Sequence, residues 1–443
     1  MKADRPAGGQ AHGPAVDLGP LLKDAGVAGE NGTLVVGGVP LPAIARALGT
    51  PAYIYNAEVI RARYRALDQA FAGIPHRLCY AIKANSNLAV LRIFRDLGAG
   101  ADIVSGGEMR RALAAGFAPD HVVFSGVGKT TAELAAAVEA GLGHVHLESV
   151  EEMTELARIA GAGGRRMKVG IRVNPDVSAS THPYISTGQG GIKFGVPHDQ
   201  VLPLAEAIHR SGPLELDTIA MHLGSQLLDP GPYVEGLGRL LALIERIRAA
   251  GIDTLRHLDI GGGLGIRYRD ETPLNPARVA EAVIPLVKPT GLTLVLEPGR
   301  YLVGTAGILL TRVLSRKHSG GKDLVIVDAG MNDLVRPSHY GAWHGIAEVE
   351  AHGRPEARVD VVGPVCETGD FLALDRSLPG LARGDLLAVL GAGAYGFVMS
   401  STYNTRPRPA EVLVDRGRWA VVRPRIREDE IFAQETAEPH WET

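Results

Sequence analysis

Short apolar runs alternate with amphipathic stretches between residues 79 and 299 of the chain. The runs are rich in β-prone side chains, whereas stretches such as "TAELAAAVEAG" space their apolar residues for one face of a helix. Eight runs follow one another: "CYAIKA", "GADIVS", "HVVFSG", "HVHLES", "MKVGIRVN", "TIAMHLG", "HLDIGGG" and "LTLVLEPG". Eight β/α units within about 220 residues predict a (β/α)8, or TIM, barrel, which typically needs about 250. An open doubly wound sheet is the alternative, but it usually has fewer strands and carries a nucleotide fingerprint.

After residue 300 the pattern changes to β-prone runs separated by turns, for example "KDLVIVDAG". Residues 301–443 are therefore predicted to form an all-β domain with an acidic tail, and residues 57–300 to form the barrel. The early strand "TPAYIYN" has no helix partner, so residues 33–56 are expected to pair with the C-terminal sheet. Residues 1–32 are rich in Gly, Ala and Pro without periodicity, which predicts a loose tail.

Two glycine-rich stretches imitate nucleotide-binding motifs but lack a required glycine. "FSGVGKTTAEL" ends like a P-loop, yet the position five residues before Gly128 is Val123. In "DIGGGLGIRY" the dinucleotide spacing counted from Gly261 ends on Ile266. Binding of ATP or of a dinucleotide is therefore not predicted, which favours the barrel.

The predicted strands end in many ionisable and small polar residues. In a barrel of this kind the carboxyl ends of the strands meet at one mouth, where binding and catalytic groups lie. The mouth is therefore expected to bind a small anionic ligand and to move protons. The strand-end residues are Lys83, Asp102, Ser105, Glu148, Ser149, Arg172, Asn174, His222, Gly224, Ser225, Asp259, Gly261, Gly262, Gly263, Glu297, Gly299 and Arg300.

Each of these residues also has a structural interpretation. Lys83 is either a salt-bridge partner or, if burial and nearby cations lower its pKa, an amine for a Schiff base. The Gly261–Gly263 run is a tight turn or, with Ser225 and Arg300, a phosphate cradle. His222 either fills the core or stacks on a planar ring. Glu297 either pairs with Arg300 or holds a pyridine nitrogen, and the four functional alternatives together indicate pyridoxal 5′-phosphate (PLP).

Composition limits the remaining classes of function. The chain is 45% hydrophobic and 21% charged with a net charge of −3, so no basic surface for nucleic acid or anionic lipid is expected. No apolar run approaches the roughly 18 residues of a membrane span, and the N-terminus lacks a signal-peptide core, which predicts a cytoplasmic protein. Two distant cysteines, Cys79 and Cys366, form no disulfide framework, and no metal site is predicted.

The chain resembles the fold type III PLP-dependent decarboxylases, and within them most closely the enzymes that act on diaminopimelate. The likeness runs from "GTPAYIYN" to "RPRPAEVLV", nearly the whole chain without its tails. The matching motifs are "YAIKAN", "GADIVSGGEM", "VNPDVSASTHPYISTGQGGIKFG", "HLGSQ", "DIGGGLGIRY", "EPGR", "DAGMNDLVRPSHYGAWH", "GPVCETGD" and "GAYGFVMSSTYNTRPRPAE". So many motifs in the right order imply an alanine-racemase-like barrel with a C-terminal β domain.

The resemblance also implies roles for individual residues. Lys83 would hold PLP covalently, and Cys366 would be the proton donor, reaching the site of a neighbouring chain in a homodimer. The cofactor-binding residues would be Lys83, His222, Ser225, Gly261, Gly262, Gly263, Glu297, Gly299, Arg300 and Tyr395. The substrate-binding residues would be Arg300, Arg336, Tyr340, Glu367 and Tyr395.

The reaction expected from this set is decarboxylation of meso-2,6-diaminopimelate to L-lysine and CO2, the last step of lysine biosynthesis. A carboxylate at Glu297 keeps the ring nitrogen protonated, whereas racemases of the alanine type place an arginine there. Arg336 offers a bidentate clamp for a distal carboxylate, and Glu367 a partner for the distal ammonium.

Two alternatives remain. One is a decarboxylase for a related amino acid, such as ornithine, lysine, arginine or a carrier-bound substrate. Departures from the family pattern at His146, Ser338 and His339 leave room for a related substrate. The other alternative is a catalytically dead homologue, which the presence of Lys83 and Cys366 disfavours.

Overall fold

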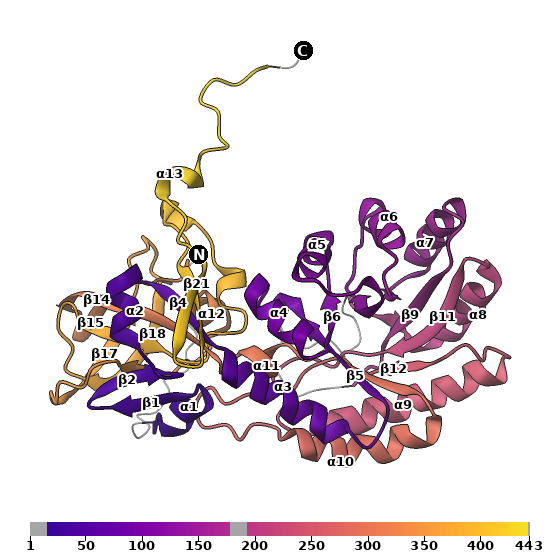
Figure 1. Cartoon of the computed structure of the whole chain (residues 1–443), viewed down its shortest axis with the longest axis horizontal. Helices are drawn as coiled ribbons and strands as arrows, with labels where there is room; N and C mark the ends of the chain where they lie inside the picture. Colours follow the sequence, from indigo (N-terminus) through magenta and orange to yellow (C-terminus); the bar gives the residue numbers. More distant parts are fainter. Residues whose placement is uncertain (1–15, 178–192, 442–443) are drawn as a thin grey trace.

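The computed structural model describes residues 16–177 and 193–441, which form two lobes, a barrel and a sheet domain (Figure 1). Residues 178–192, which belong to one motif of the family resemblance, lie outside the described part. Among the described residues, no helix has both the length and the apolar character needed to cross a membrane.

The barrel contains the eight predicted strands, all parallel and closed by the pairing of β8 with β9. Around the barrel the order is β5, β6, β7, β8, β9, β11, β12 and β13, and β13 returns to β5. Their bounds are β5 (His76–Ala81), β6 (Gly100–Ile103), β7 (Val122–Phe124), β8 (His144–Leu147), β9 (Met167–Asn174), β11 (Leu214–Ala220), β12 (His257–Asp259) and β13 (Thr293–Leu296). The prediction of a (β/α)8 barrel is confirmed.

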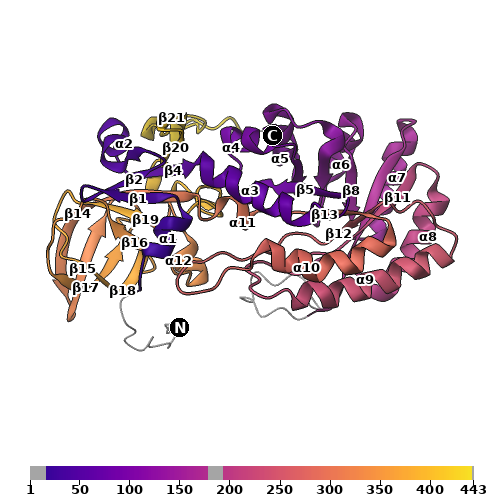
Figure 2. The same ribbon diagram turned by 60° about the horizontal axis from the view of Figure 1, so that its bottom comes forward.

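Amphipathic helices surround the barrel and bury their apolar faces against it (Figure 2). They are α4 (Leu88–Asp96), α5 (Gly106–Ala115), α6 (Thr131–Ala140), α7 (Val150–Ala162), α8 (Val201–Ser211), α9 (Gly231–Ala249) and α10 (Pro276–Val287). Helix α3 (Ala57–Phe71), which precedes the first barrel strand, lies between α4 and α10 and closes the ring. The barrel is followed directly by the short helix α11 (Arg300–Val303).

Ser105 and Ser149, two strand-end residues, begin helices. The Ser105 hydroxyl accepts a hydrogen bond from the Glu108 backbone N–H at 3.2 Å, and Ser149 accepts one from Glu152 at 3.1 Å. These two serines are N-caps of α5 and α7, and their strand-end position follows from the short β/α loops.

The second lobe is a nine-stranded sheet, mostly antiparallel. Its main order is β18, β17, β15, β14, β4, β20 and β21, with β19 pairing β14 and β16. The bounds are β4 (Ala52–Asn56), β14 (Gly307–Ser319), β15 (Lys322–Val327), β16 (Ile346–Glu348), β17 (Glu356–Val362), β18 (Phe371–Pro379), β19 (Leu386–Val389), β20 (Ala410–Asp415) and β21 (Arg418–Arg423). The early strand β4 lies between β14 and β20, and all five of its residues are buried.

Further N-terminal elements pack on this sheet domain. They are α1 (Gly19–Asp24), the small sheet of β1 (Val27–Glu30), β2 (Thr33–Val36) and β3 (Val39–Pro40), and α2 (Leu41–Leu48). The predicted loose tail is therefore wrong for residues 16–32. Leu21 and Val27 are buried in a cluster with Leu390 of the sheet domain, a long-range contact that local periodicity does not reveal.

The segment after Lys83 connects the two lobes. The Tyr395 backbone N–H donates to the Ala84 carbonyl at 2.9 Å, and the Asn85 side-chain amide donates to the Gly393 carbonyl at 3.2 Å. The Asn87 amide donates to Glu411 of β20 at 3.0 Å, while its oxygen caps α4. The small polar residues after the first strand thus dock the sheet domain against the barrel mouth.

Candidate active site at the barrel mouth

Lys83 leaves the first barrel strand and points to the buried carboxylate of Asp102 on the next strand. Its Nζ donates to Asp102 Oδ2 at 3.0 Å, and Asp102 Oδ1 has no hydrogen-bond partner among the described residues. The lysine side chain is 35% exposed, whereas that of Asp102 is inaccessible. Burial lowers the pKa of Lys83, but the negative charges of Asp102 and Glu297 outweigh it and raise the pKa overall. The predicted lowering by nearby cations is therefore wrong, because the nearest charges are carboxylates.

A cluster of buried acidic groups lies inside the barrel behind this lysine. Glu297 follows β13, Asp259 ends β12, and each is at most 7% exposed. Burial and the neighbouring charge of Asp102 raise the pKa of Glu297 to about 7, and burial raises that of Asp259. The negative charge of Glu297 also raises the pKa of Asp259, so the two neighbouring carboxyls disfavour each other's ionisation.

Ser125 and His146 complete this cluster. The Ser125 hydroxyl donates to Glu297 Oε1 at 3.0 Å and lies 3.4 Å from His146 Nδ1. Burial lowers the pKa of His146 far below its usual range, so the ring is neutral. Ligand atoms of His146, Asp259 and Glu297 lie within 4.8 Å of one another, so these three side chains form a closely packed buried group.

His222 follows β11 and stands beside the glycine turn after β12. The Gly262 backbone N–H donates to His222 Nδ1 at 3.2 Å. Burial lowers the pKa of His222, so the imidazole is neutral and its proton is on Nε2. A side chain at Gly261 would lie 2.6 Å from this ring, and one at Gly262 would lie 2.3 Å from the Glu297 carbonyl. The turn can therefore lie against His222 and the Glu297 carbonyl only because both positions are glycine.

Arg300 begins α11 and is held by three neighbours. Its Nε and NH2 donate to the Ser225 hydroxyl at 3.1 and 2.9 Å, and its NH1 donates to the Tyr268 hydroxyl at 2.7 Å. The guanidinium also lies over the ring of Tyr395, 4.9 Å from its centroid. Tyr395 has a backbone φ of 56°, a conformation that the surrounding loop must hold.

Arg336, which begins α12 (Arg336–Tyr340), is the second buried arginine of the mouth. Its NH1 donates to His344 Nε2 at 2.9 Å, and His344 Nδ1 donates to the Leu390 carbonyl at 2.8 Å. The guanidinium lies over the ring of Tyr268, 4.5 Å from the ring centroid. Neither Arg336 nor Arg300 forms an ion pair with a carboxylate of the described residues. Two buried positive charges without a counterion form a strong anion site.

Cys366 and Glu367 lie apart from these groups, on an exposed loop between β17 and β18. The Cys366 backbone N–H donates to Asn404 at 2.8 Å, and Glu367 interacts with Tyr403. Asp370 fixes the loop by accepting from the backbones of Met331 and Val365, both at 2.6 Å. The loop is thus ordered, but both predicted functional side chains face outward.

The structure brings most of the predicted residues together at one mouth and adds others. Tyr340 lies near both buried arginines. Tyr268, Ser125 and His344 were not predicted, since none of them follows from a local pattern, although Tyr268 closes the motif "DIGGGLGIRY". Lys129, the lysine of the P-loop-like motif, donates hydrogen bonds to three acceptors, including the His146 carbonyl at 2.7 Å, and therefore has a structural role.

The side chains and the glycine turn of the mouth fit PLP on structural grounds. The mouth offers groups for an aldehyde, a phosphate and a cationic ring nitrogen. They are the amine of Lys83, the glycine turn, the two arginines without a carboxylate partner and the Asp102 oxygen without a hydrogen-bond partner among the described residues. Glu297 is suited to bind the ring nitrogen, because a positive charge beside this carboxyl would lower its raised pKa.

Comparisons with known proteins agree with this geometry. A family profile described as "Pyridoxal-dependent decarboxylase, pyridoxal binding domain" matches residues 57–304. The diaminopimelate decarboxylase of Pseudomonas aeruginosa is 51% identical over 91% of this chain and 96% of its own. That of Pseudomonas fluorescens is 49% identical over 92% and 98%. The crystal structure of diaminopimelate decarboxylase from Helicobacter pylori complexed with L-lysine superposes with a TM-score of 0.86 at 38% identity, covering 89% of this chain and 98% of that one.

Proposed function

This chain belongs to the pyridoxal-dependent decarboxylases, and from that premise we propose that it converts meso-2,6-diaminopimelate to L-lysine and CO2. The observation that carries the proposal is Arg336, a buried arginine without a carboxylate partner among the described residues. A substrate with a carboxylate at each end provides one for the reacting centre and one for this clamp. Ornithine, lysine and arginine have no distal carboxylate and would leave Arg336 uncompensated.

PLP is the cofactor, and when bound it supplies an electron sink for the carbanion that remains as CO2 leaves. Lys83 would hold the cofactor covalently, and neutral His222 would pack on its ring. Its phosphate would be held by Ser225, Arg300, Tyr395 and the glycine set Gly261, Gly262, Gly263 and Gly299. These assignments rest on the positions of the side chains at the mouth and on the family.

The acidic cluster sets the charge at the ring nitrogen. Glu297 is buried and lies near the charge of Asp102, and both effects raise its pKa and so favour a proton on or near it. A protonated ring nitrogen stays protonated next to this carboxylate, whereas a guanidinium at the same position would expel the proton. The chain therefore favours carbanion stabilisation, as decarboxylation requires.

We assign the final protonation to Cys366, from a second copy of the chain in a homodimer. The exposed position of Cys366 and Glu367, on an ordered loop that makes its hydrogen bonds within the sheet domain, supports this assignment. A thiol can serve as a general acid that donates its proton to a carbanion. Glu367 from the same loop would hold the distal ammonium, and Tyr340 would line the distal end of the site.

We also propose that the two domains supply different parts of the site. The barrel, residues 57–300, binds PLP, and residues 301–443 supply Arg336, Tyr340, Cys366, Glu367 and Tyr395. The family profile, which covers residues 57–304, supports the first boundary. The near-neutral charge supports a protein that acts in the cytoplasm without a nucleic-acid partner.

Substitution of Arg336 tests the substrate. In Arg336→Gln the clamp loses one charge-assisted contact, so we expect the KM for meso-diaminopimelate to rise at least about tenfold, with PLP absorbance intact. Arg358→Gln, at an exposed arginine of the same domain, is the matched control and should leave the KM unchanged. An unchanged KM in Arg336→Gln would refute the distal-carboxylate clamp and favour a decarboxylase of a related amino acid.

A further inference from the structure

A second group of charged side chains lies at the opposite end of the barrel. His144 and His257 begin β8 and β12, and Arg77 lies near the start of β5. Together with neighbouring loops they line a pocket of about 370 Å³, here named the floor pocket. Arg77 is six residues before Lys83, which places the floor pocket about 20 Å along the strand from the mouth.

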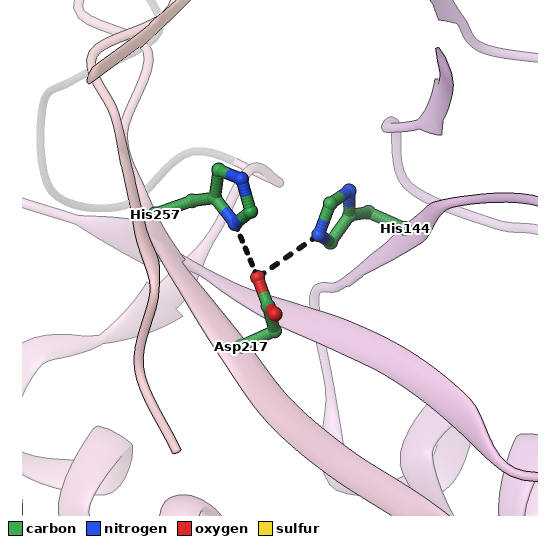
Figure 3. Close-up of side chains that lie close together, drawn as sticks. All are labelled: His144, Asp217 and His257. Carbon is green, nitrogen blue, oxygen red and sulfur yellow. Dashed lines mark hydrogen bonds and ion pairs between the residues drawn. The ribbon is translucent and has the colours of Figure 1, made fainter. Parts of the chain in front are cut away.

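The inner wall of the floor pocket is a His–Asp–His group. Figure 3 shows both imidazole rings pointing to one oxygen of Asp217. His144 Nε2 lies 3.0 Å from Asp217 Oδ1, and His257 Nδ1 hydrogen-bonds to the same oxygen. Asp217 is fully buried and sits at a register shift of β11, where a bulge redirects its side chain. Burial alone would raise its pKa, but the two histidine hydrogen bonds lower it, so it is a carboxylate.

The outer wall of the floor pocket is strongly basic. Lys168 Nζ lies 3.6 Å from Asp217 Oδ2, yet the lysine side chain is 53% exposed and can turn toward the pocket. Neither Arg77 nor Arg165 forms an ion pair among the described residues, whereas Arg166 pairs with Glu215 at 3.5 Å. The charged groups that face the two rings are Arg77 on β5, Asp120 in the loop before β7, Arg165 and Arg166 before β9, Lys168 on β9, and Asp217 on β11. Positive charge therefore exceeds negative charge in a concave site, which concentrates anions.

We propose that the floor pocket binds a small oxyanion of the sulfate or phosphate type. Arg77 and Lys168 supply positive charge, and the two imidazole rings supply donors. The inner nitrogen of each ring is occupied by Asp217, which leaves His144 Nδ1 and His257 Nε2 without a hydrogen-bond partner among the described residues. In a neutral ring this outer nitrogen is only an acceptor, so it binds an anion only after taking up a proton. Asp217, behind the rings, stabilises the imidazolium that results.

A divalent metal ion is the competing occupant of the His–Asp–His group. Ligand atoms of the three residues lie within 4.8 Å of one another, a spacing that a metal ion could also use. However, Asp217 is the only carboxylate of this group, and Arg77 and Lys168 are close by. Two positive charges beside a single carboxylate repel a dication, whereas they attract an oxyanion.

The proposal is tested by equilibrium dialysis of the PLP-loaded protein with labelled sulfate. We expect Arg77→Gln and Lys168→Gln each to weaken sulfate binding about tenfold, since each removes a charge-assisted contact. Arg158→Gln, at an exposed arginine of α7 paired with Glu155, is the matched control and should bind sulfate like the parent protein. Lys168 is exposed, so its variant will fold even if that of Arg77 does not.

Three outcomes would overturn the proposal. If sulfate binding is lost in Arg336→Gln but kept in Lys168→Gln, the anion sits at the barrel mouth. If Zn²⁺ alone binds more tightly in Lys168→Gln and is lost in His257→Ala, the group is a metal site. Burial lowers the pKa of His144, so its ring gains this donor only in acid, and we expect sulfate, which keeps its charge, to bind more tightly at pH 4.5 than at pH 7. An affinity independent of pH would exclude the imidazoles as donors.

Discussion

At the residue scale, the behaviour of the mouth depends on a group of buried carboxylates. Lys83 pairs with Asp102, and Glu297 lies near both Asp259 and Asp102, so each pKa depends on several buried neighbours. A cation at the position proposed for the pyridine nitrogen of PLP would compensate this negative charge. PLP binding should therefore change the protonation of the cluster and, through it, the stability of the fold.

Glu297→Gln tests this coupling. The folded pKa of Glu297, about 7, lies above its unfolded value, so the stability of the PLP-free protein falls as pH rises from about 4.5 to 7. We expect Glu297→Gln to remove this fall, leaving the PLP-free variant more stable than the parent at pH 8 by up to about 3 kcal/mol. Thermal unfolding at pH 5 and pH 8 measures the difference. Parallel pH profiles for the variant and the parent would show that Glu297 is not the titrating group.

At this scale the sequence predicts positions better than interactions. The ends of the eight strands are recognisable because apolar runs stop at polar residues, and these residues do meet at one mouth. The direction of the Lys83 pKa shift was not predictable, since it depends on the burial of Asp102 and Glu297. Ser125, Tyr268 and His344 contact the site from separate segments, and no local pattern distinguishes them from core residues.

At the element scale, the glycine turn after β12 connects the strand ends to the proposed cofactor site. Gly262 donates to His222 and approaches the Glu297 carbonyl so closely that no side chain fits. The same glycine run reads as a simple turn from sequence alone. Its second function is visible only when the neighbouring strand ends are in place.

A methyl group at this turn should therefore disturb PLP binding. In Gly262→Ala the new carbon would meet the Glu297 carbonyl, so the loop must move and His222 must shift with it. We expect PLP affinity to fall at least about tenfold, as measured by absorbance titration, a loss that corresponds to about 1.4 kcal/mol. Gly238→Ala on α9, where the added carbon has no neighbour within 4 Å, is the control and should bind PLP normally. Equal affinities in both variants would argue against a cofactor contact at this turn.

At the scale of the whole molecule, the barrel and the sheet domain depend on each other. Asn85 and Asn87 tie the segment after Lys83 to the sheet domain, so movement of either lobe would shift the lysine. Sequence periodicity predicts both folds, because each depends on local patterns. It does not predict α1 and β1, which are stabilised by contacts with the distant sheet domain.

The proposed sharing of the active site between two chains makes a prediction about mixed dimers. Lys83→Ala and Cys366→Ala should each be nearly inactive as homodimers. A heterodimer of the two variants has one site with both residues intact, so random mixing should restore about a quarter of the parent activity. Mixing Lys83→Ala with Arg336→Gln, two residues assigned to the same chain's site, is the control and should give no more activity than its Arg336→Gln component contributes alone. Failure of the first pair to complement would place Cys366 in the site of its own chain or remove its role.

The most direct test of the proposed reaction is a competition among substrates. The PLP-loaded protein is incubated with equal amounts of meso-diaminopimelate, L-ornithine, L-lysine and L-arginine, and the products are quantified by mass spectrometry. The uncompensated Arg336 predicts that diaminopimelate is consumed and L-lysine accumulates, while the other three amino acids are not decarboxylated. Formation of putrescine, cadaverine or agmatine without L-lysine from diaminopimelate would contradict the account.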